Sequence, residues 1–289
     1  MSAAGPSSPD APRPDEAATA RGGVELAASR RVEIVRLLEA LGGARVTDLA
    51  ERFDVSEMTI RRDLDDLDRR GLARKVHGGA LPTGGTTEDP GFERKSRLAM
   101  AEKRAIAGAA AQMVEPGMSV ILSAGTTTWY LGGLLRAVPA LTVVTNSANI
   151  ARQVHDPGTS GQHVILTGGT FRTPSDALVG EVARAALGHV HADLLFLGVH
   201  GLDLEHGLTT PTLAEAEVDR LMLRQSRRAV VLADHTKPGV VGFAHVAPLS
   251  DVDVLVCGDP LDEAWRGPLA EAVGHLRLVD VGVADDDQA

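Results

Sequence analysis

The chain has 289 residues, 44% of them hydrophobic, which is enough for two globular domains with a substantial core. Its net charge of -10 argues against a broadly basic nucleic-acid-binding protein, although one small basic face stays compatible with that charge. Aromatic residues make up only 3%, so a base-stacking surface for single strands is not expected, and the single cysteine, Cys257, excludes an internal disulfide and a cysteine-rich zinc site.

Residues 1–27 are rich in Pro, Ala, Ser and Gly, a composition typical of a disordered tail. They contain no apolar run of the kind a signal peptide needs, and no later run is long enough to span a bilayer. We therefore expect a cytoplasmic protein with no membrane partner.

Residues 28–82 carry the pattern of a winged helix-turn-helix domain. A helical apolar stripe that Gly42 and Gly43 end predicts a first helix, and Thr47 is the expected N-cap of a second. Ser56 is the expected N-cap of a third helix, with Val55 packing on Ile60. The segment "GLARKVHGGALP" then predicts two short strands joined by a glycine turn.

The third helix holds the candidate DNA contacts. Ile60, Leu64 and Leu67 form its apolar stripe, which leaves Arg61 and Arg62 in the first turns, where a helix in the major groove meets the bases. Arginine suits this position because its planar fork can bond a guanine edge in two places or clamp a phosphate. Positive charge near the wing is expected to contact phosphate. The candidate DNA-binding residues are Ser56, Met58, Thr59, Arg61, Arg62, Lys75, His77 and Gly78.

A solvated helix is the alternative for this segment. Its arginines would then form ion pairs at a spacing of four, Arg61 with Asp65 and Arg62 with Asp66. The order of elements around the helix, with two helices before it and a glycine hairpin after it, favours DNA binding.

The ungapped segment "VTDLAERFDVSEMTIRRDLDDLDRRGLARKVHGGA" closely resembles the N-terminal signature of the DeoR-type bacterial transcriptional regulators. The resemblance implies that Ser56, Thr59, Arg61 and Arg62 lie on the recognition helix. It also implies that His77, Gly78 and Gly79 belong to the wing. The signature does not say which of these residues contacts a base.

A polar linker, residues 83–95, is expected to lead into a second domain, residues 96–289. Near-continuous apolar strands alternate there with helical segments, which predicts a doubly wound, mostly parallel α/β sheet covered on both faces. The predicted helices include "LAMAEKRAIAGAAAQMV", "LAEAEVDRLMLRQS" and "DEAWRGPLAEAV". The predicted strands are "MSVILS", "LTVVT", "HVILT", "ADLLFLG", "RAVVLAD", "DVDVLVC" and "HLRLVDV".

Small and polar residues follow several of these strands, and in open parallel sheets ligands bind beyond the carboxyl ends of the strands. Gly125 and the three threonines at 126–128 can bind an anion at a helix start, and Lys237 adds a positive charge. Asn146, Asp203, Glu215 and Asp234 can hydrogen-bond sugar hydroxyls. Each signal alone is also explained by helix capping, a turn or a solvated side chain.

The motifs "AGTTT", "TNS", "TGG", "FLGVHGLD", "GLTT" and "ADHTK" occur in the order of the DeoR-type effector domain, which is similar in fold to ribose 5-phosphate isomerase. The resemblance implies a phosphorylated sugar as the inducer. Ser123 departs from the family, because many members carry an acid there. The candidate ligand-binding residues are Gly125, Thr126, Thr127, Thr128, Asn146, Ser147, Gly168, Gly169, Asp203, Glu215, Asp234 and Lys237.

These features together predict a sugar-responsive repressor that binds double-stranded operator DNA as a homo-oligomer, a dimer or a tetramer. No cofactor, metal or catalytic residue is expected in this interpretation. The alternative is an isomerase or deaminase with Glu215, Asp203 or Asp234 as its general base and Lys237 stabilising the oxyanion. A metal sensor has little support, because the histidines at 155, 163, 189 and 191 have no cysteine partners.

Overall fold

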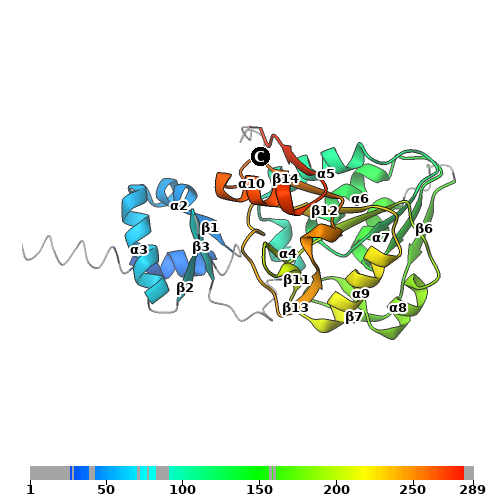
Figure 1. The fold of residues 1–289 in the computed structure, drawn as a ribbon, viewed down its shortest axis with the longest axis horizontal. Helices are drawn as coiled ribbons and strands as arrows, with labels where there is room; N and C mark the ends of the chain where they lie inside the picture. The colour runs from blue at the N-terminus through cyan, green and yellow to red at the C-terminus, as the bar shows by residue number, and fades with distance from the viewer. Residues whose placement is uncertain are drawn as a thin grey trace, which may run out of the picture.

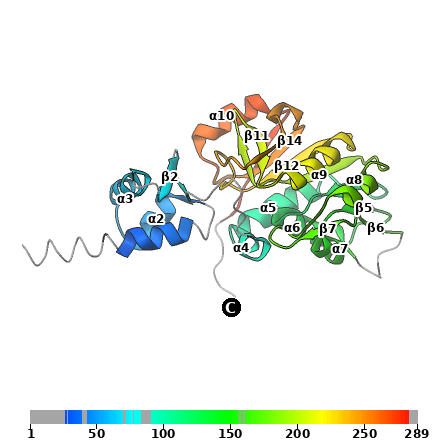
Figure 2. The ribbon, with the colours of Figure 1, turned by 90° about the horizontal axis from the view of Figure 1, so that it is seen from below.

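The computed structural model describes residues 27, 29–38, 43–69, 72–76, 78–82, 91–155, 158 and 161–282. Figures 1 and 2 show a small N-terminal domain beside a larger α/β domain. The predicted winged helix followed by a mostly parallel α/β domain is confirmed. No helix among the described residues is long and apolar enough to cross a membrane.

In the part of the small domain that the structure describes, three helices accompany a three-stranded antiparallel sheet of order β1-β3-β2. Its core joins all three helices, with Ile34 and Leu38 packing against Leu49, Ile60 and Leu64. Strand β1 was not predicted, because a strand of two residues is too short to show an alternating sequence pattern. After the helix at 29–38, the elements are β1 (Ala44–Arg45), α2 (Val46–Phe53), α3 (Glu57–Arg69), β2 (Ala73–Val76) and β3 (Gly79–Pro82).

The predicted N-cap at Thr47 is wrong. Helix α2 begins one residue earlier, at Val46, with Arg45 at the cap position and no side-chain cap. The reason is that Val46 is buried and donates its N–H to Gly78 O at 2.8 Å. A carbonyl of the wing therefore replaces a capping side chain as the acceptor for this first helical amide. The predicted helix stop at Gly42 and the predicted wing residue His77 lie outside the described residues.

A parallel sheet of order β15-β14-β12-β9-β4-β5-β6 forms the centre of the large domain, and all seven predicted strands are confirmed in it. Its strands are β4 (Ser119–Leu122), β5 (Thr142–Thr145), β6 (His163–Leu166), β9 (Leu194–Gly198), β12 (Ala229–Ala233), β14 (Val254–Gly258) and β15 (Leu276–Val279). The helices are α4 (Phe92–Ser96), α5 (Met100–Ala111), α6 (Thr126–Leu135), α7 (Ala148–Val154), α8 (Glu181–Leu187), α9 (Leu213–Arg224) and α10 (Glu263–Ala272).

Both faces of the central strands of this sheet are buried, whereas the edge strand β6 is largely exposed. Val120 and Leu122 of β4 pack in one cluster with residues of α5, α6 and α7. Ile121, between them, packs in a second cluster with residues of α8, α9 and α10. Successive side chains of a strand point to opposite faces, so two helical layers explain the near-continuous apolar strands. Cys257 is buried in the second cluster, and burial raises the pKa of its thiol.

The chain reverses the direction in which it adds strands between β4 and its neighbour β9. Strands β5 and β6 extend the sheet on one side, whereas β12, β14 and β15 extend it on the other. Two smaller sheets, which the sequence did not predict, lie outside the main one. One is β10 (Gly201–Asp203), β11 (Gly207–Thr210) and β13 (Ala244–Ala247), and the other is β7 (Thr170–Arg172) with β8 (Ala177–Val179).

Candidate functional site

Helix α3 presents two exposed arginines near its start. Ser56 caps the helix as predicted, because its Oγ accepts the Thr59 N–H at 3.2 Å. The stripe of Ile60, Leu64 and Leu67 is buried, and Arg61 and Arg62 are exposed beside it. Met58, in the same turn, is 60% exposed. The exposed side of the first two turns therefore combines two guanidinium groups with small and apolar side chains.

The ion pairs of the solvated-helix alternative do not form. Arg61 pairs instead with Glu57 at 3.1 Å, one turn earlier. Asp65 contacts Lys75 Nζ of β2 at 2.5 Å. Asp66 contacts Arg31 and Arg69. Asp65 and Asp66 of α3 therefore pair with residues other than its two exposed arginines.

The buried member of this acidic group is Asp63, which is 3% exposed. Its two carboxylate oxygens accept from Arg30 Nε at 2.6 Å and Arg31 Nε at 2.8 Å. Paired charges of this kind avoid the cost of burying an unpaired carboxylate. Asp63 therefore fixes α3 against the helix at 29–38.

The wing lies against the large domain. Gly78 has φ +78°, which favours glycine, and a Cβ there would collide with the Asp262 side chain. Arg74 Nη2 donates to Gly239 O at 2.9 Å. Arg61 and Gly78 line one crevice together with Asp262. Access to these two candidate DNA-binding residues therefore depends on where the small domain sits.

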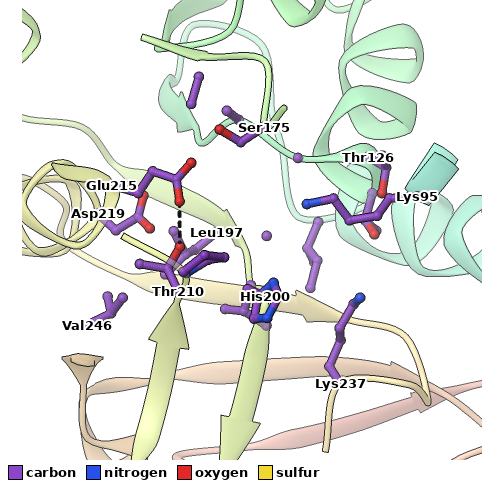
Figure 3. A pocket seen from close by; sticks show the side chains of 18 of the residues that line it. Lys95, Thr126, Ser175, Leu197, His200, Thr210, Glu215, Asp219, Lys237 and Val246 are labelled. Atoms are coloured by element: carbon purple, nitrogen blue, oxygen red, sulfur yellow. Dashed lines mark hydrogen bonds between the residues drawn. The ribbon is translucent and has the colours of Figure 1, made fainter. Parts of the chain in front are cut away.

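A pocket lies at the carboxyl ends of β4 and β9, where the strand order reverses (Figure 3). It is lined by Ala124 to Thr127 after β4, by Gly198 at the end of β9, and by Val199 and His200 after it. The two strand ends approach closely, since a Cβ at Gly125 would lie 3.7 Å from Gly198 Cα. Ligand crevices of open α/β sheets form at this kind of position.

One wall of the pocket is the start of α6. Gly125 occupies the N-cap position and offers no side-chain cap, so the first amides of the helix are not satisfied by a capping side chain. Thr126 and Thr127 line the pocket, whereas Thr128 bonds back to Gly125 O at 3.0 Å and does not line it. A helix N-terminus with amides facing a pocket favours an anion.

Two lysines line the pocket from different segments. Figure 3 shows Lys95 beside Thr126 and Lys237 approaching from another side. Asp234, in the loop of Lys237, is buried outside the lining and accepts from Thr236 N at 3.0 Å. Burial opposes its ionisation, but Lys237 and Lys103 hold the pKa of Asp234 far below its usual range. Asp234 therefore positions the Lys237 loop.

The opposite wall carries carboxyl groups. Glu215 accepts from Arg172 Nε at 3.0 Å and from Thr210 Oγ1 at 2.9 Å. Asp219, one turn further along α9, also lines the pocket. Burial and the charge of Glu215 raise the pKa of Asp219 well above its usual range, although Arg220 opposes this. Asp219 in its neutral form can donate a hydrogen bond as well as accept one.

Asn146 lines the pocket between these walls and braces it. Its Oδ1 accepts from Ala124 N at 2.7 Å, and its Nδ2 donates to Leu178 O at 3.2 Å. The neighbouring Ser147 faces away, because its Oγ caps α7 and contacts Asp176. Burial raises the pKa of Asp176.

The structure divides the predicted ligand residues into two groups. Those that line the pocket are Gly125, Thr126, Thr127, Asn146, Glu215 and Lys237. Those outside its lining are Thr128, Ser147, Gly168, Gly169, Asp203 and Asp234. Gly168 and Gly169 form a turn with positive φ, and Asp203 caps a turn through the amides of Glu205 and His206. Of the three possible general bases, only Glu215 reaches the pocket, and both its oxygens are engaged.

Sequence reasoning missed several lining residues, among them the polar or aromatic side chains of Phe92, Lys95, His200 and Asp219. Phe92 and Lys95 fall in the predicted linker, and their spacing carries no signal. His200 lies inside the motif "FLGVHGLD", which was available as a signal. Among the described residues, no three His, Cys, Asp or Glu side chains gather as a metal site would require.

Comparisons with known proteins cover both domains. A model of the DeoR-like helix-turn-helix domain matches residues 30–83, and one of the DeoR C terminal sensor domain matches residues 98–259. The chain is 35% identical to a putative aga operon transcriptional repressor of Escherichia coli O157:H7, over 88% of this chain and 92% of that protein. It is 36% identical to the HTH-type transcriptional regulator GlpR of Haloferax volcanii, over 90% and 99%.

Solved structures resemble the chain more weakly. Ribose 5-phosphate isomerase from Plasmodium falciparum gives a TM-score of 0.35 at 14% identity, covering 50% of this chain and 55% of that one. A likeness of this size carries no argument about function.

Proposed function

The chain belongs to the DeoR family of transcriptional regulators, and we propose that it represses a carbohydrate-utilisation operon until a phosphorylated sugar releases it from its operator. Similarity to a putative repressor of the aga operon supports repression. The observation that supports the proposal most strongly is the pocket at the ends of β4 and β9, where the strand order reverses. In this pocket the N-terminus of α6 lies together with two lysines. The protein acts in the cytoplasm in this proposal.

The DNA-binding end is the exposed side of α3 together with the wing. Arg61 and Arg62 contact base edges or phosphate in the major groove, and Ser56, Met58 and Thr59 surround them. Lys75, His77 and Gly78 approach the phosphate backbone from the wing. Two copies related by a two-fold axis are needed to occupy two half-sites, so the active protein is a dimer or a tetramer.

The effector end takes the phosphate at the start of α6, through Gly125, Thr126 and Thr127, with Lys237 supplying charge. Asn146 and Glu215 lie where sugar hydroxyls come within reach. Binding favours a conformation in which the paired DNA-binding domains no longer fit their half-sites. The proposed domains are 28–82 for DNA binding and 96–289 for the effector, joined by 83–95.

The experiment that tests this function measures binding of the purified protein to DNA from around its own gene. We expect sequence-preferring binding whose affinity falls steeply with salt, because phosphate contacts release counterions. A member of a panel of sugar phosphates should weaken that binding and raise the thermal midpoint. Sequence-independent binding at all salt concentrations would overturn the proposal.

The proposal includes no catalysis. Of the three possible general bases, only Glu215 lines the pocket. Both of its carboxylate oxygens already accept hydrogen bonds, one from Arg172 and one from Thr210. Incubation with aldose and ketose phosphates tests this point. Steady conversion between the two would contradict it.

A further inference from the structure

Helix α4 is part of the pocket, although it lies in the segment that leads from the small domain. Phe92 and Lys95 of this helix line the pocket. The Phe92 N–H donates to Pro174 O at 2.6 Å, and the Phe92 ring meets Trp129 of α6 edge to face at 6.2 Å. The effector domain therefore builds its pocket with a helix that directly follows the segment 83–90.

A buried lysine joins α4 to the loop of Lys237. Lys103 of α5 is 2% exposed, and its Nζ donates to Lys95 O at 2.5 Å and to Leu98 O at 2.6 Å. The same Nζ lies 3.6 Å from Asp234 Oδ2. Burial lowers the pKa of Lys103 to about 8, while Asp234 opposes that shift. One ammonium group thus links the backbone of α4 to the loop on the other side of the pocket.

The pocket is polarised. In Figure 3, Lys95 and Thr126 lie on one side, and Glu215 and Asp219 lie on the opposite side. Arg172 offsets the charge of Glu215, and the raised pKa of Asp219 favours its neutral form. Two lysines and a helix N-terminus therefore dominate the charged end. That end suits a phosphate of nearly two negative charges, and the carboxyl end suits hydroxyl groups.

Both segments that carry these lysines are also connected to the small domain. Helix α4 is connected covalently, because it is the next element along the chain after the small domain. The loop after β12 is connected through Gly239, whose carbonyl accepts from Arg74 of the small domain at 2.9 Å. A ligand that draws the two lysines together therefore acts on both connections at once.

Resting on the proposed function, we propose that Lys95 of α4 binds the effector phosphate together with Lys237, so that effector binding fastens the helix that leads to the DNA-binding domain. Lys95 is then a ligand-binding residue and also the link between the pocket and the operator. The hydroxyl groups of the sugar face Glu215 and Asp219 in this arrangement.

Thermal shift of the full-length protein tests the first part. The probes are inorganic phosphate, ribose 5-phosphate, fructose 6-phosphate and glucose 6-phosphate, each sugar also as its phosphate-free parent. For probes that stabilise the wild type, Lys95→Ala should raise the Kd about 10-fold to 100-fold, as expected for a lost charge-assisted hydrogen bond. Lys95→Arg should recover most of the affinity, and Arg94→Ala, an exposed neighbour on α4, should leave it unchanged.

Operator release tests the second part. At saturating effector, Lys95→Ala should still hold operator DNA that the wild type and Arg94→Ala release. The midpoint without ligand checks that each variant folds. Equal Kd values for wild type and Lys95→Ala would overturn the inference and leave the proposed function standing. Full release by Lys95→Ala at saturation would overturn the link to the operator. No stabilisation of the wild type by any phosphate probe would overturn both the proposed function and the inference.

Discussion

The two proposed binding surfaces differ in how the chain assembles them. Arg61 and Arg62 are adjacent on one helix, and the phase of that helix alone exposes them. Lys95 lies before the first strand of the main sheet and Lys237 follows β12, so the two lysines meet only through the fold. A surface built by one helix can be identified from local sequence, whereas a pocket built by distant segments needs the tertiary contacts. The same difference predicts that the two surfaces fail independently when mutated.

Removal of one arginine from α3 should have the largest effect. We expect Arg62→Ala to abolish specific operator binding, because each lost base or phosphate contact costs about 1–3 kcal/mol and a dimer loses two. Effector affinity should not change. Fluorescence anisotropy with labelled operator DNA measures the first quantity and calorimetry the second. Arg227→Ala, which removes an exposed arginine from the large domain, is the matched control. Unchanged operator affinity would remove Arg62 from the interface.

The reciprocal change is Lys237→Ala in the pocket. The variant should bind operator DNA normally but require about 10-fold to 100-fold more effector for release, since a charge-assisted contact is lost. A titration of effector into the protein–DNA complex measures this shift. Normal induction would show that Lys237 does not contact the ligand, and would then leave only Lys95 at the charged end.

Asp63 tests whether the DNA-binding domain depends on its buried ion pairs. Asp63→Ala should lower the free energy of unfolding of the small domain by about 2 kcal/mol, less than for a fully buried pair because Arg30 and Arg31 are partly exposed. Asp65→Ala is the control, because its pair with Lys75 is exposed and should contribute at most about 1 kcal/mol. Chemical denaturation compares the two. Equal losses would contradict the role of burial.

The smallest predicted effect is a pH dependence at the contact between the domains. His235 lines a crevice with Arg45, and its Nδ1 donates to Glu102 Oε2 at 2.6 Å. Burial and Arg45 lower its pKa, but Glu102 and Asp234 outweigh them and raise it above 6.5. Its stabilisation is therefore full below pH 6.5 and is lost as the pH rises through the folded-state pKa.

We expect the free energy of unfolding of the wild type to fall in that window relative to His235→Gln, because the folded state holds the His235 proton more tightly than the unfolded state does. Denaturation at several pH values from 6 to 9 measures the difference. A difference in unfolding free energy that stays constant with pH would show that the contact with Glu102 does not raise the pKa of His235.

The main sheet was predictable because each of its strands is a near-continuous apolar run, which in the central strands reflects burial on both faces. All seven predicted runs are strands in the structure. The sheet of β10, β11 and β13 was not, because its three to four residues per strand carry motif residues rather than a period. Of the pocket, the sequence predicted the residues that directly follow strands, such as Gly125. It missed Lys95, whose place depends on Phe92 contacting Pro174 and Trp129, far away in the chain.

The buried carboxylate of Asp63 has a consequence for how the protein can be switched. Because Asp63 and the shared core hold α3 against the helix at 29–38, we expect the recognition surface to move as one rigid body. A signal from the pocket can then change the separation and tilt of two such bodies but not the shape of either. Induction then acts through the spacing and orientation of two half-site contacts rather than through the shape of either recognition surface.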